Sequence, residues 1–206
     1  MQKTFFQYKQ RGGYTIIEMM IAISLFLVVV MSGMTALLNA NFVHNKSRDM
    51  REILDNLSFI MEDMSRNLRT GYDYRCFGEQ DTISYIDIEK PRSCDIGYAI
   101  AFEHQDGDPN VSSDQWVYKI EEDPSSGGSR PPLMLWKSEN SGQTWVQLNP
   151  TEIVIDKTSG FEVYGAPSED GLQPLVAITL KGSISLKGNV TPFTLRTSVS
   201  QRLIDI

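Results

Sequence analysis

The sequence is poor in residues that interrupt helices or build metal sites. No proline occurs between Met1 and Lys90, and the chain of 206 residues contains only two cysteines and two histidines. It has no Cys-x-x-Cys motif and no Cys/His cluster, so a zinc site is not indicated. A Gly-x-Ser-x-Gly motif is also missing, which argues against a serine hydrolase. Because proline breaks helix interiors, its absence permits one long helix in the N-terminal part.

Formal charge is missing from the twenty residues 19–38. A helix of this length is about 30 Å long, which is enough to cross a bilayer. Three cations and no acidic residue precede Glu18. The positive-inside rule therefore places the leader in the cytoplasm and everything beyond Leu38 outside it.

A short motif stands immediately before the apolar run. From Gly13 to Glu18 the chain reads Gly-Tyr-Thr-Ile-Ile-Glu. This segment resembles the processing site of the type IV prepilin family, whose pattern is Gly, an aromatic or apolar residue, Thr or Ser, two apolar residues and Glu. The resemblance implies that a prepilin peptidase cleaves between Gly13 and Tyr14 and that Tyr14 is N-methylated. Glu18 would then be the fifth residue of the mature protein.

Two simpler interpretations of the N-terminus explain less. A secretory signal has an apolar core of seven to fifteen residues and a small residue at its cleavage site, whereas this run is longer and Leu38 stands at that position. A plain single-pass anchor explains the length of the run but not Glu18 behind Gly12 and Gly13. A carboxylate at the centre of a membrane helix costs about 2.5 to 3.5 kcal/mol, and less toward the interface, so its presence calls for a partner.

Apolar residues continue at helical spacing beyond the span, which predicts an amphipathic extension of the same helix. We predict one helix from Tyr14 to about Arg69, ended at Thr70 and Gly71, with Gly71 in the left-handed C-cap position. The predicted apolar stripe consists of Phe42, Val43, Met50, Ile53, Leu54, Leu57, Ile60, Met61, Met64 and Leu68.

After Gly71 the pattern changes to the alternation of short strands. The turns between them are rich in glycine, proline and aspartate, and such short connections favour antiparallel pairing. The expected strands are 82–88, 97–103, 115–120, 133–137, 144–148, 153–155, 161–164, 175–180 and 191–199.

The predicted architecture is an α+β, pilin-like fold in which one long N-terminal helix packs on a mainly antiparallel sheet. The pilin-like fold that the resemblance implies agrees with this local interpretation. Four segments follow: a prepilin leader over 1–13, a transmembrane and assembly helix over 14–38, an amphipathic helix over 39–70 that belongs to the globular head, and a β-rich head over 71–206.

The two cysteines, Cys76 and Cys94, lie in the exported part with seventeen residues between them. Outside the cytoplasm we expect them to form a disulfide, which would contribute about 3 kcal/mol in the chain-entropy model. His104, Asp106 and Asp108 could ligate a metal, but their composition is that of an ordinary turn, so no metal and no other cofactor is predicted.

Charge and aromatic residues bear on what the exported part binds. The formal charge of −7 includes three cations of the leader, so removal of the leader leaves −10, which argues against a nucleic-acid partner. Trp116, Trp136 and Trp145 could form a sugar-binding platform, although burial against the helix is the interpretation we favour.

The resemblance implies a structural role. We expect a minor pilin or pseudopilin, most similar to the J-type minor pseudopilins of type II secretion or the W-type minor pilins of type IV pili. Thr35 stands near the place where many major pilins carry proline, which weakens a major-pilin interpretation. The implied partners are the prepilin peptidase, other pilins in a filament or tip complex, the inner-membrane assembly platform and, before assembly, membrane lipid.

The expected location is the inner membrane with an extracytoplasmic head, and afterwards a periplasmic pseudopilus or a cell-surface pilus. In this interpretation Glu18 neutralises the new ammonium group at Tyr14, either within one subunit or between neighbours. The alternative function is a pilus-tip adhesin or receptor whose head binds a surface, a glycan or DNA. A third possibility, an anchored enzyme, has no supporting motif, and we expect no enzymatic activity.

Overall fold

The computed structural model describes residues 12–83, 90–108, 110–124, 131–167, 171–186 and 188–202. Contacts divide the chain into two compact units, Met1–Arg48 and Asp49–Ile206, which we call the anchor unit and the head unit. Of the predicted leader, only Gly12 and Gly13 lie among the described residues.

The predicted N-terminal helix is confirmed. Helix α1 comprises Ile16–Thr70, so it begins two residues after and ends one residue after the predicted limits. The helix belongs to the anchor unit up to Arg48 and to the head unit from Asp49 onward. The long uninterrupted helix agrees with the absence of proline from this part of the sequence.

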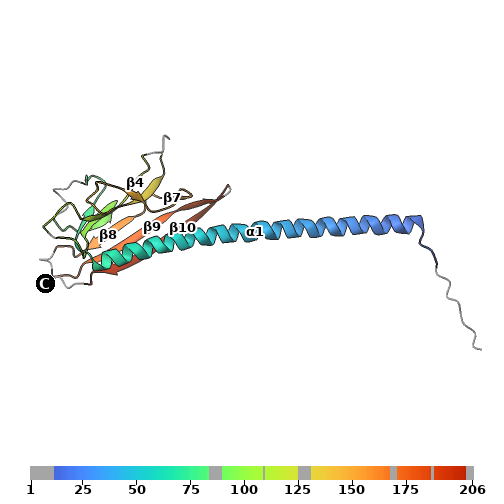
Figure 1. Ribbon diagram of the computed structural model, residues 1–206, viewed down its shortest axis with the longest axis horizontal. Coiled ribbons are helices and arrows are strands. Elements are labelled where there is room, and N and C mark those ends of the chain that lie inside the picture. The colour runs from blue at the N-terminus through green and yellow to red at the C-terminus, as the bar shows by residue number, and fades with distance from the viewer. Residues whose placement is uncertain are drawn as a thin grey trace, which may run out of the picture. The chain divides into compact units, whose positions relative to one another are not determined.

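Within the head unit, the last part of α1 lies along the sheet (Figure 1). One face of this part is buried. The spacing of three and four residues places the buried side chains on one stripe, as the sequence predicts. The buried residues are Leu57, Ile60, Met61, Met64 and Leu68. Met50 and Ile53 pack at the margin of the core. Phe42 and Val43, which the prediction included in the stripe, are 56% and 63% exposed.

The helix ends before Gly71, as predicted, but the left-handed conformation predicted for Gly71 was wrong. Gly71 does not adopt a left-handed conformation. A Cβ atom at this position would overlap the ring of Phe102 and lie 3.0 Å from the carbonyl oxygen of Glu103. Glycine is required here because a strand passes close to the backbone, not because the helix ends in a left-handed cap.

The carbonyl groups of Leu68 and Arg69, near the end of α1, accept hydrogen bonds from residues outside the helix. The Arg202 N–H donates to the Arg69 carbonyl oxygen at 2.8 Å. The hydroxyl of buried Tyr74 lies within hydrogen-bond distance of the carbonyl oxygens of Leu68 and Gly71. These contacts take the place of a local C-cap motif.

The head unit contains one antiparallel sheet, which confirms the predicted α+β class. The order of neighbouring strands is β1-β3-β4-β5-β7-β9-β8-β2, with β10 paired to β9 and β6 paired to β5. The strands are β1 (Tyr72–Phe77), β2 (Cys94–Gly97), β3 (Ala99–Glu103), β4 (Trp116–Glu122), β5 (Leu133–Ser138), β6 (Val146–Gln147), β7 (Ile153–Ile155), β8 (Gly160–Tyr164), β9 (Leu175–Leu186) and β10 (Asn189–Ser200).

Most of the expected strands are confirmed, with three differences. β1 was not predicted, and the strand predicted over 97–103 contains β3 but only the last residue of β2. β9 extends six residues beyond its predicted end because it pairs with β8 along its first half, with β7 along its second half and with β10 throughout. The strand expected over 82–88 falls mostly outside the described residues.

The sheet has apolar side chains on both faces. The larger cluster contains the buried stripe of α1 and the inward residues of the strands, among them Phe102, Tyr118 and Ile178. A smaller cluster on the other face is made of Phe77, Ala99, Ala101 and Val117. The alternation along β3, with Ile100 and Phe102 in one cluster and Ala99 and Ala101 in the other, is what the pleat of a strand requires.

Candidate functional site

The predicted processing motif forms the start of α1. The Glu18 N–H donates to the Thr15 hydroxyl oxygen at 3.3 Å, and the Met19 N–H donates to the Thr15 carbonyl oxygen at 3.2 Å. Thr15 is therefore the N-cap residue, and Glu18 occupies the third helical position. Ser or Thr followed three residues later by Glu is the pattern of a capping box.

This local role of Glu18 was missed in the sequence, although Thr-x-x-Glu before an apolar run is its signal. An acidic side chain in the first helical turn also interacts favourably with the helix dipole, typically by 0.3–1 kcal/mol at exposed positions. Glu18 thus has a reason to be present within a single chain, and any role in assembly must be separated from this one.

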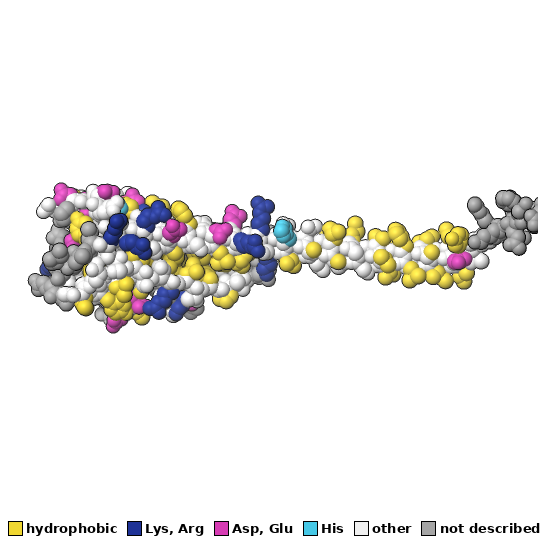
Figure 2. Space-filling model, turned by 90° about the horizontal axis from the view of Figure 1, so that it is seen from below, with side chains coloured by type: hydrophobic (Ala, Val, Ile, Leu, Met, Phe, Trp, Pro, Cys, Tyr) yellow, Lys and Arg dark blue, Asp and Glu magenta, His cyan; other side chains and the backbone are white. Residues whose placement is uncertain are grey.

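The apolar side chains of the anchor unit contact little else within the described chain. Every residue from 12 to 45 is exposed, and Tyr14 and Ile16 are 79% and 83% exposed. Figure 2 shows hydrophobic side chains along this part of α1, with an acidic side chain near its start. Among the described residues, α1 is the one helix long and apolar enough to cross a membrane.

The hydroxyl groups within the apolar run are satisfied by their own helix. Ser24 donates to the Ile21 carbonyl oxygen, and Ser32 and Thr35 donate to carbonyl oxygens four residues earlier, at 2.8 to 2.9 Å. Because unsatisfied polar groups are costly in hydrocarbon, this arrangement suits contact with lipid or with neighbouring apolar helices.

Cys76 and Cys94 are joined by a disulfide in the head unit, with their Cα atoms 5.8 Å apart. The bond connects β1 and β2, which are the two ends of the strand order. The Cys76 N–H also donates to the Arg92 carbonyl oxygen at 3.0 Å, so backbone contacts support the same closure. The disulfide therefore holds the two ends of the sheet together.

Gly97 makes room for this bond, a role that the sequence pattern did not reveal. A Cβ atom at Gly97 would overlap the Cys76 sulfur, lie 2.7 Å from the Phe77 carbonyl oxygen and lie 3.1 Å from the Cys94 sulfur. A Tyr98 N–H to Phe77 carbonyl bond of 2.9 Å keeps the two segments at this distance.

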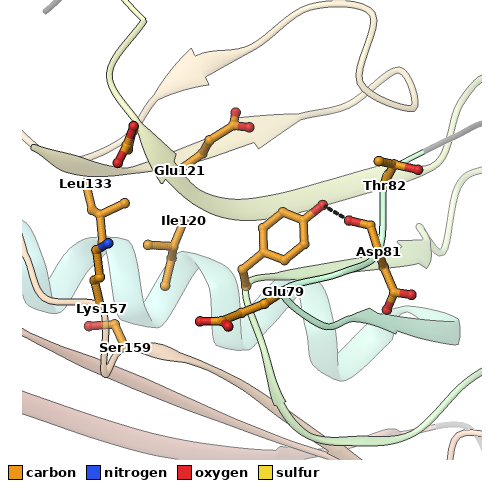
Figure 3. Close-up of a pocket in the computed structure, with 10 residues that line it drawn as sticks. Glu79, Asp81, Thr82, Ile120, Glu121, Leu133, Lys157 and Ser159 are labelled. Carbon is orange, nitrogen blue, oxygen red and sulfur yellow. Dashed lines mark hydrogen bonds between the residues drawn. The ribbon is translucent and has the colours of Figure 1, made fainter. Parts of the chain in front are cut away.

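A surface pocket of the head unit shows no catalytic arrangement. Figure 3 shows Glu79, Asp81, Glu121, Lys157 and Ser159 among its lining residues. The Ser159 hydroxyl donates to the Lys181 carbonyl oxygen at 2.9 Å and accepts the Lys181 N–H at 2.8 Å. A hydroxyl held by the backbone in this way serves strand pairing and is not positioned as a nucleophile.

Asp81 at the same pocket also has a structural role. It accepts hydrogen bonds from the Gly78 N–H at 2.8 Å and from Arg92 at 3.2 Å. The Gly78 N–H, followed by Arg92, lowers the pKa of the Asp81 carboxyl, which stabilises its ionised form. The Tyr98 hydroxyl donates to the Asp81 carbonyl oxygen at 2.9 Å, which is the dashed contact in Figure 3.

His104, Asp106 and Asp108 are not gathered into a metal site. His104 stacks on Trp116 with 4.1 Å between ring centroids, and Asp108 accepts hydrogen bonds from Asn110 within the turn. Among the described residues, no group of three His, Cys, Asp or Glu side chains is arranged to hold a metal ion.

The favoured prediction of three tryptophans buried against the helix was wrong. All three are half-buried. Trp116 packs at the margin of the helix-side cluster, whereas Trp145 packs on the cluster of the opposite face. The Lys119 ammonium lies 3.8 Å from the Trp145 ring centroid, and the Lys137 ammonium lies 4.0 Å from that of Trp116. These are cation–π contacts within the head.

An exposed apolar helix start with a prepilin-type motif, attached to a helix that packs on an antiparallel sheet, is the arrangement of type IV pilin-like proteins. Residues 8–34 match the family described as the prokaryotic N-terminal methylation motif. The match supports a membrane-anchored protein of the pilin or pseudopilin kind. No curated protein and no solved structure shows significant similarity to the chain.

Proposed function

We propose that the chain is a minor pilin or pseudopilin that helps to initiate or cap a type IV pilus or a type II secretion pseudopilus. The observation that supports this function is the division of α1. Its first part carries the methylation motif and exposes its apolar side chains, whereas its last part belongs to the core of a folded head. A filament subunit needs an apolar helix for lateral packing and a folded head for contacts at the filament surface.

Cleavage between Gly13 and Tyr14 would create a new ammonium group at Tyr14, four residues before Glu18. In an apolar bundle each of these charges alone would be desolvated at a large cost, and pairing them removes much of that cost. The pair can form within one chain or between neighbours. A subunit then moves most favourably from lipid into the bundle at the axial position where the ammonium group and the carboxylate meet.

Processing is tested by mass spectrometry of the protein extracted from membranes. We expect a mature N-terminus at methylated Tyr14. Gly13→Val should block cleavage, whereas Gly12→Val should be cleaved normally. Neither substitution should disturb folding, because nothing among the described residues lies within 4 Å of a Cβ atom built at Gly12 or Gly13. Recovery of wild-type protein with its original N-terminus from cells with an active peptidase would contradict the proposal.

The variant Glu18→Gln tests whether the charge of Glu18 matters separately from its capping role. Glutamine also serves in a capping box, so this variant keeps the local hydrogen-bonding capacity but loses the charge. We expect normal processing and about tenfold lower incorporation into filaments, with Glu52→Gln on the exposed part of the same helix as the control. Incorporation of Glu18→Gln at the wild-type level, together with loss of incorporation in Glu18→Ala, would show that Glu18 acts as a cap alone.

The place in assembly is tested by deleting the gene and counting filaments by electron microscopy. Loss or strong reduction of filaments supports initiation or capping. Normal filaments that no longer adhere would instead support the tip-adhesin alternative. Turnover of a substrate by the head, unaffected by substitution of Glu18, would support an anchored enzyme and contradict the structural role.

A further inference from the structure

The loop between β3 and β4 covers a group of buried oxygen atoms. Phe102 pairs with Trp116 across the two strands, so the next residues outward, Glu103 and Gln115, face each other where the hairpin opens. Directly opposed residues in an antiparallel pair have Cβ atoms about 4.5–5.5 Å apart. Tyr72 of β1 pairs with Glu103 on its other side.

Glu103 and Gln115 are almost completely buried, at 1% and 6% exposure. Three buried side-chain oxygens in this region have no hydrogen-bond partner among the described residues: Glu103 Oε1, Gln115 Oε1 and Asp114 Oδ1. Buried polar atoms are normally satisfied, because each unsatisfied one costs roughly 1–3 kcal/mol. The three oxygens belong to two opposed strand ends and to the residue before one of them, where a bound cation would supply the partner that they lack.

The Glu103 carboxylate is directed into the loop. A Cβ atom built on Gly107 would overlap Glu103 Oε1, so this oxygen lies against the loop backbone. Asp114 contributes its other oxygen to the same loop by accepting the Asp108 N–H at 2.9 Å. The oxygens are thus enclosed between the strand ends and residues of the loop.

The electrostatic surroundings of Glu103 are acidic. Asp114, Asp73 and Asp108 all repel the ionised Glu103 carboxylate. The hydrogen bond from Gln115 favours the ionised form of Glu103. Clustered carboxylates destabilise one another unless a cation or a proton neutralises them.

We propose that the Glu103, Asp114 and Gln115 side chains bind one calcium ion beneath the 104–114 loop. All three offer oxygen, which calcium prefers, and calcium accepts six to eight ligands in flexible geometry, including backbone carbonyls and water. The proposed ligands are two carboxylates and one amide, so they are not a group of three His, Cys, Asp or Glu side chains. Zinc would favour nitrogen and sulfur ligands. This site goes beyond the assembly role proposed above and does not depend on it.

The test uses the full chain in detergent, with tryptophan fluorescence as the readout of thermal unfolding. All three tryptophans lie in the head unit, so the signal reports on the head alone. With 1 mM CaCl₂ at pH 7.5, we expect Tm to rise by about 5 °C over the value in EDTA, and MgCl₂ to have a much smaller effect. Equilibrium dialysis should show one calcium ion bound per chain.

Glu103→Gln and Asp114→Asn should each lose the calcium-dependent rise in Tm and the bound ion, whereas Asp95→Asn on the exposed part of β2 should keep both. Because Glu103→Gln removes a buried charge, we expect this variant to fold without calcium. Equal Tm values of the wild type in calcium and EDTA, with no ion retained in dialysis, would overturn the proposal. Retention of calcium by both variants would likewise place the ion elsewhere.

Discussion

The two parts of α1 have similar local structure but opposite surroundings. In the anchor unit, from Ile16 to Arg48, apolar side chains point outward with almost nothing packed on them, whereas from Leu57 to Leu68 one apolar face is enclosed by the sheet. Helix formation is therefore not what distinguishes them. The difference shows that the first part requires a solvent of another kind, lipid or neighbouring subunits, while the second obtains its surroundings from its own chain.

The largest effect is expected when a methionine is replaced by alanine in the head, compared with the same replacement in the anchor unit. Met64→Ala should lower the free energy of unfolding of the head by about 2–5 kcal/mol, because Met64 is fully buried and its truncation leaves a cavity. Met31→Ala is the matched control, since Met31 is 70% exposed in the anchor unit. Denaturation of the full chain in detergent, followed by tryptophan fluorescence, measures both. Equal losses would refute the division of the helix.

Removal of the disulfide should weaken the head and leave the anchor unit unchanged. The double variant Cys76→Ser with Cys94→Ser should lose about 3 kcal/mol, because the open chain gains entropy in its unfolded state. Denaturation of the oxidised and reduced wild type gives the corresponding comparison. If reduction left the unfolding midpoint unchanged, the closure of β1 on β2 would not depend on the covalent bond.

A smaller effect is expected at the start of the anchor unit. Thr15→Ala removes the hydroxyl that accepts the Glu18 N–H and should cost about 1 kcal/mol locally. Amide hydrogen exchange in detergent should then be about fivefold faster in the first turn, with no change in the head. Thr15→Ser keeps the hydroxyl and serves as the control. Faster exchange in Thr15→Ser as well would argue against capping.

A pH dependence confined to the head is also expected. Tyr72, Asp73, Asp108 and Asp114 interact with Glu103 electrostatically. The pKa of Glu103 is raised from 4.5 to about 7, so the folded state holds a proton that the unfolded state releases in this window. In EDTA, stability should fall by about 2 kcal/mol, or roughly 4–8 °C in Tm, as pH rises from 5 to 7.5.

Glu103→Gln is the control for this prediction. It should remove the part of the slope that Glu103 contributes, while groups elsewhere in the chain keep theirs. Asp81 and Asp108 have lowered pKa values, so they stay ionised throughout this range. An identical slope in wild type and variant would show that Glu103 does not titrate in this window.

Several features could be recognised from local sequence because their causes are local. The uncharged run, the three-and-four spacing of Leu57 to Leu68 and the alternation of the later strands each reflect the period of a single element. The motif from Gly13 to Glu18 is also contiguous. Its capping box could have been recognised in the same way, since Thr15 and Glu18 are three residues apart.

Other features could not be read from the sequence because they depend on pairing between distant segments. β1 follows the helix directly, and its identity as a strand depends on β3, which lies more than twenty residues further on. Gly71 appears as a helix cap and Gly97 as the first residue of a strand until Phe102 and the disulfide are seen to pass beside them. Glu103 and Gln115 face each other only because the β3–β4 register brings the loop ends together.

The sequence alone determined the helix, its apolar first part and the processing motif, because periodicity, charge and short motifs act over a few residues. Tertiary structure alone decided how the sheet closes, what lies against Gly71 and Gly97, and which polar atoms of the described residues are buried without partners. The physical reason is that burial and close approach are properties of segments packed together, and the residues of one segment do not reveal what will lie against it.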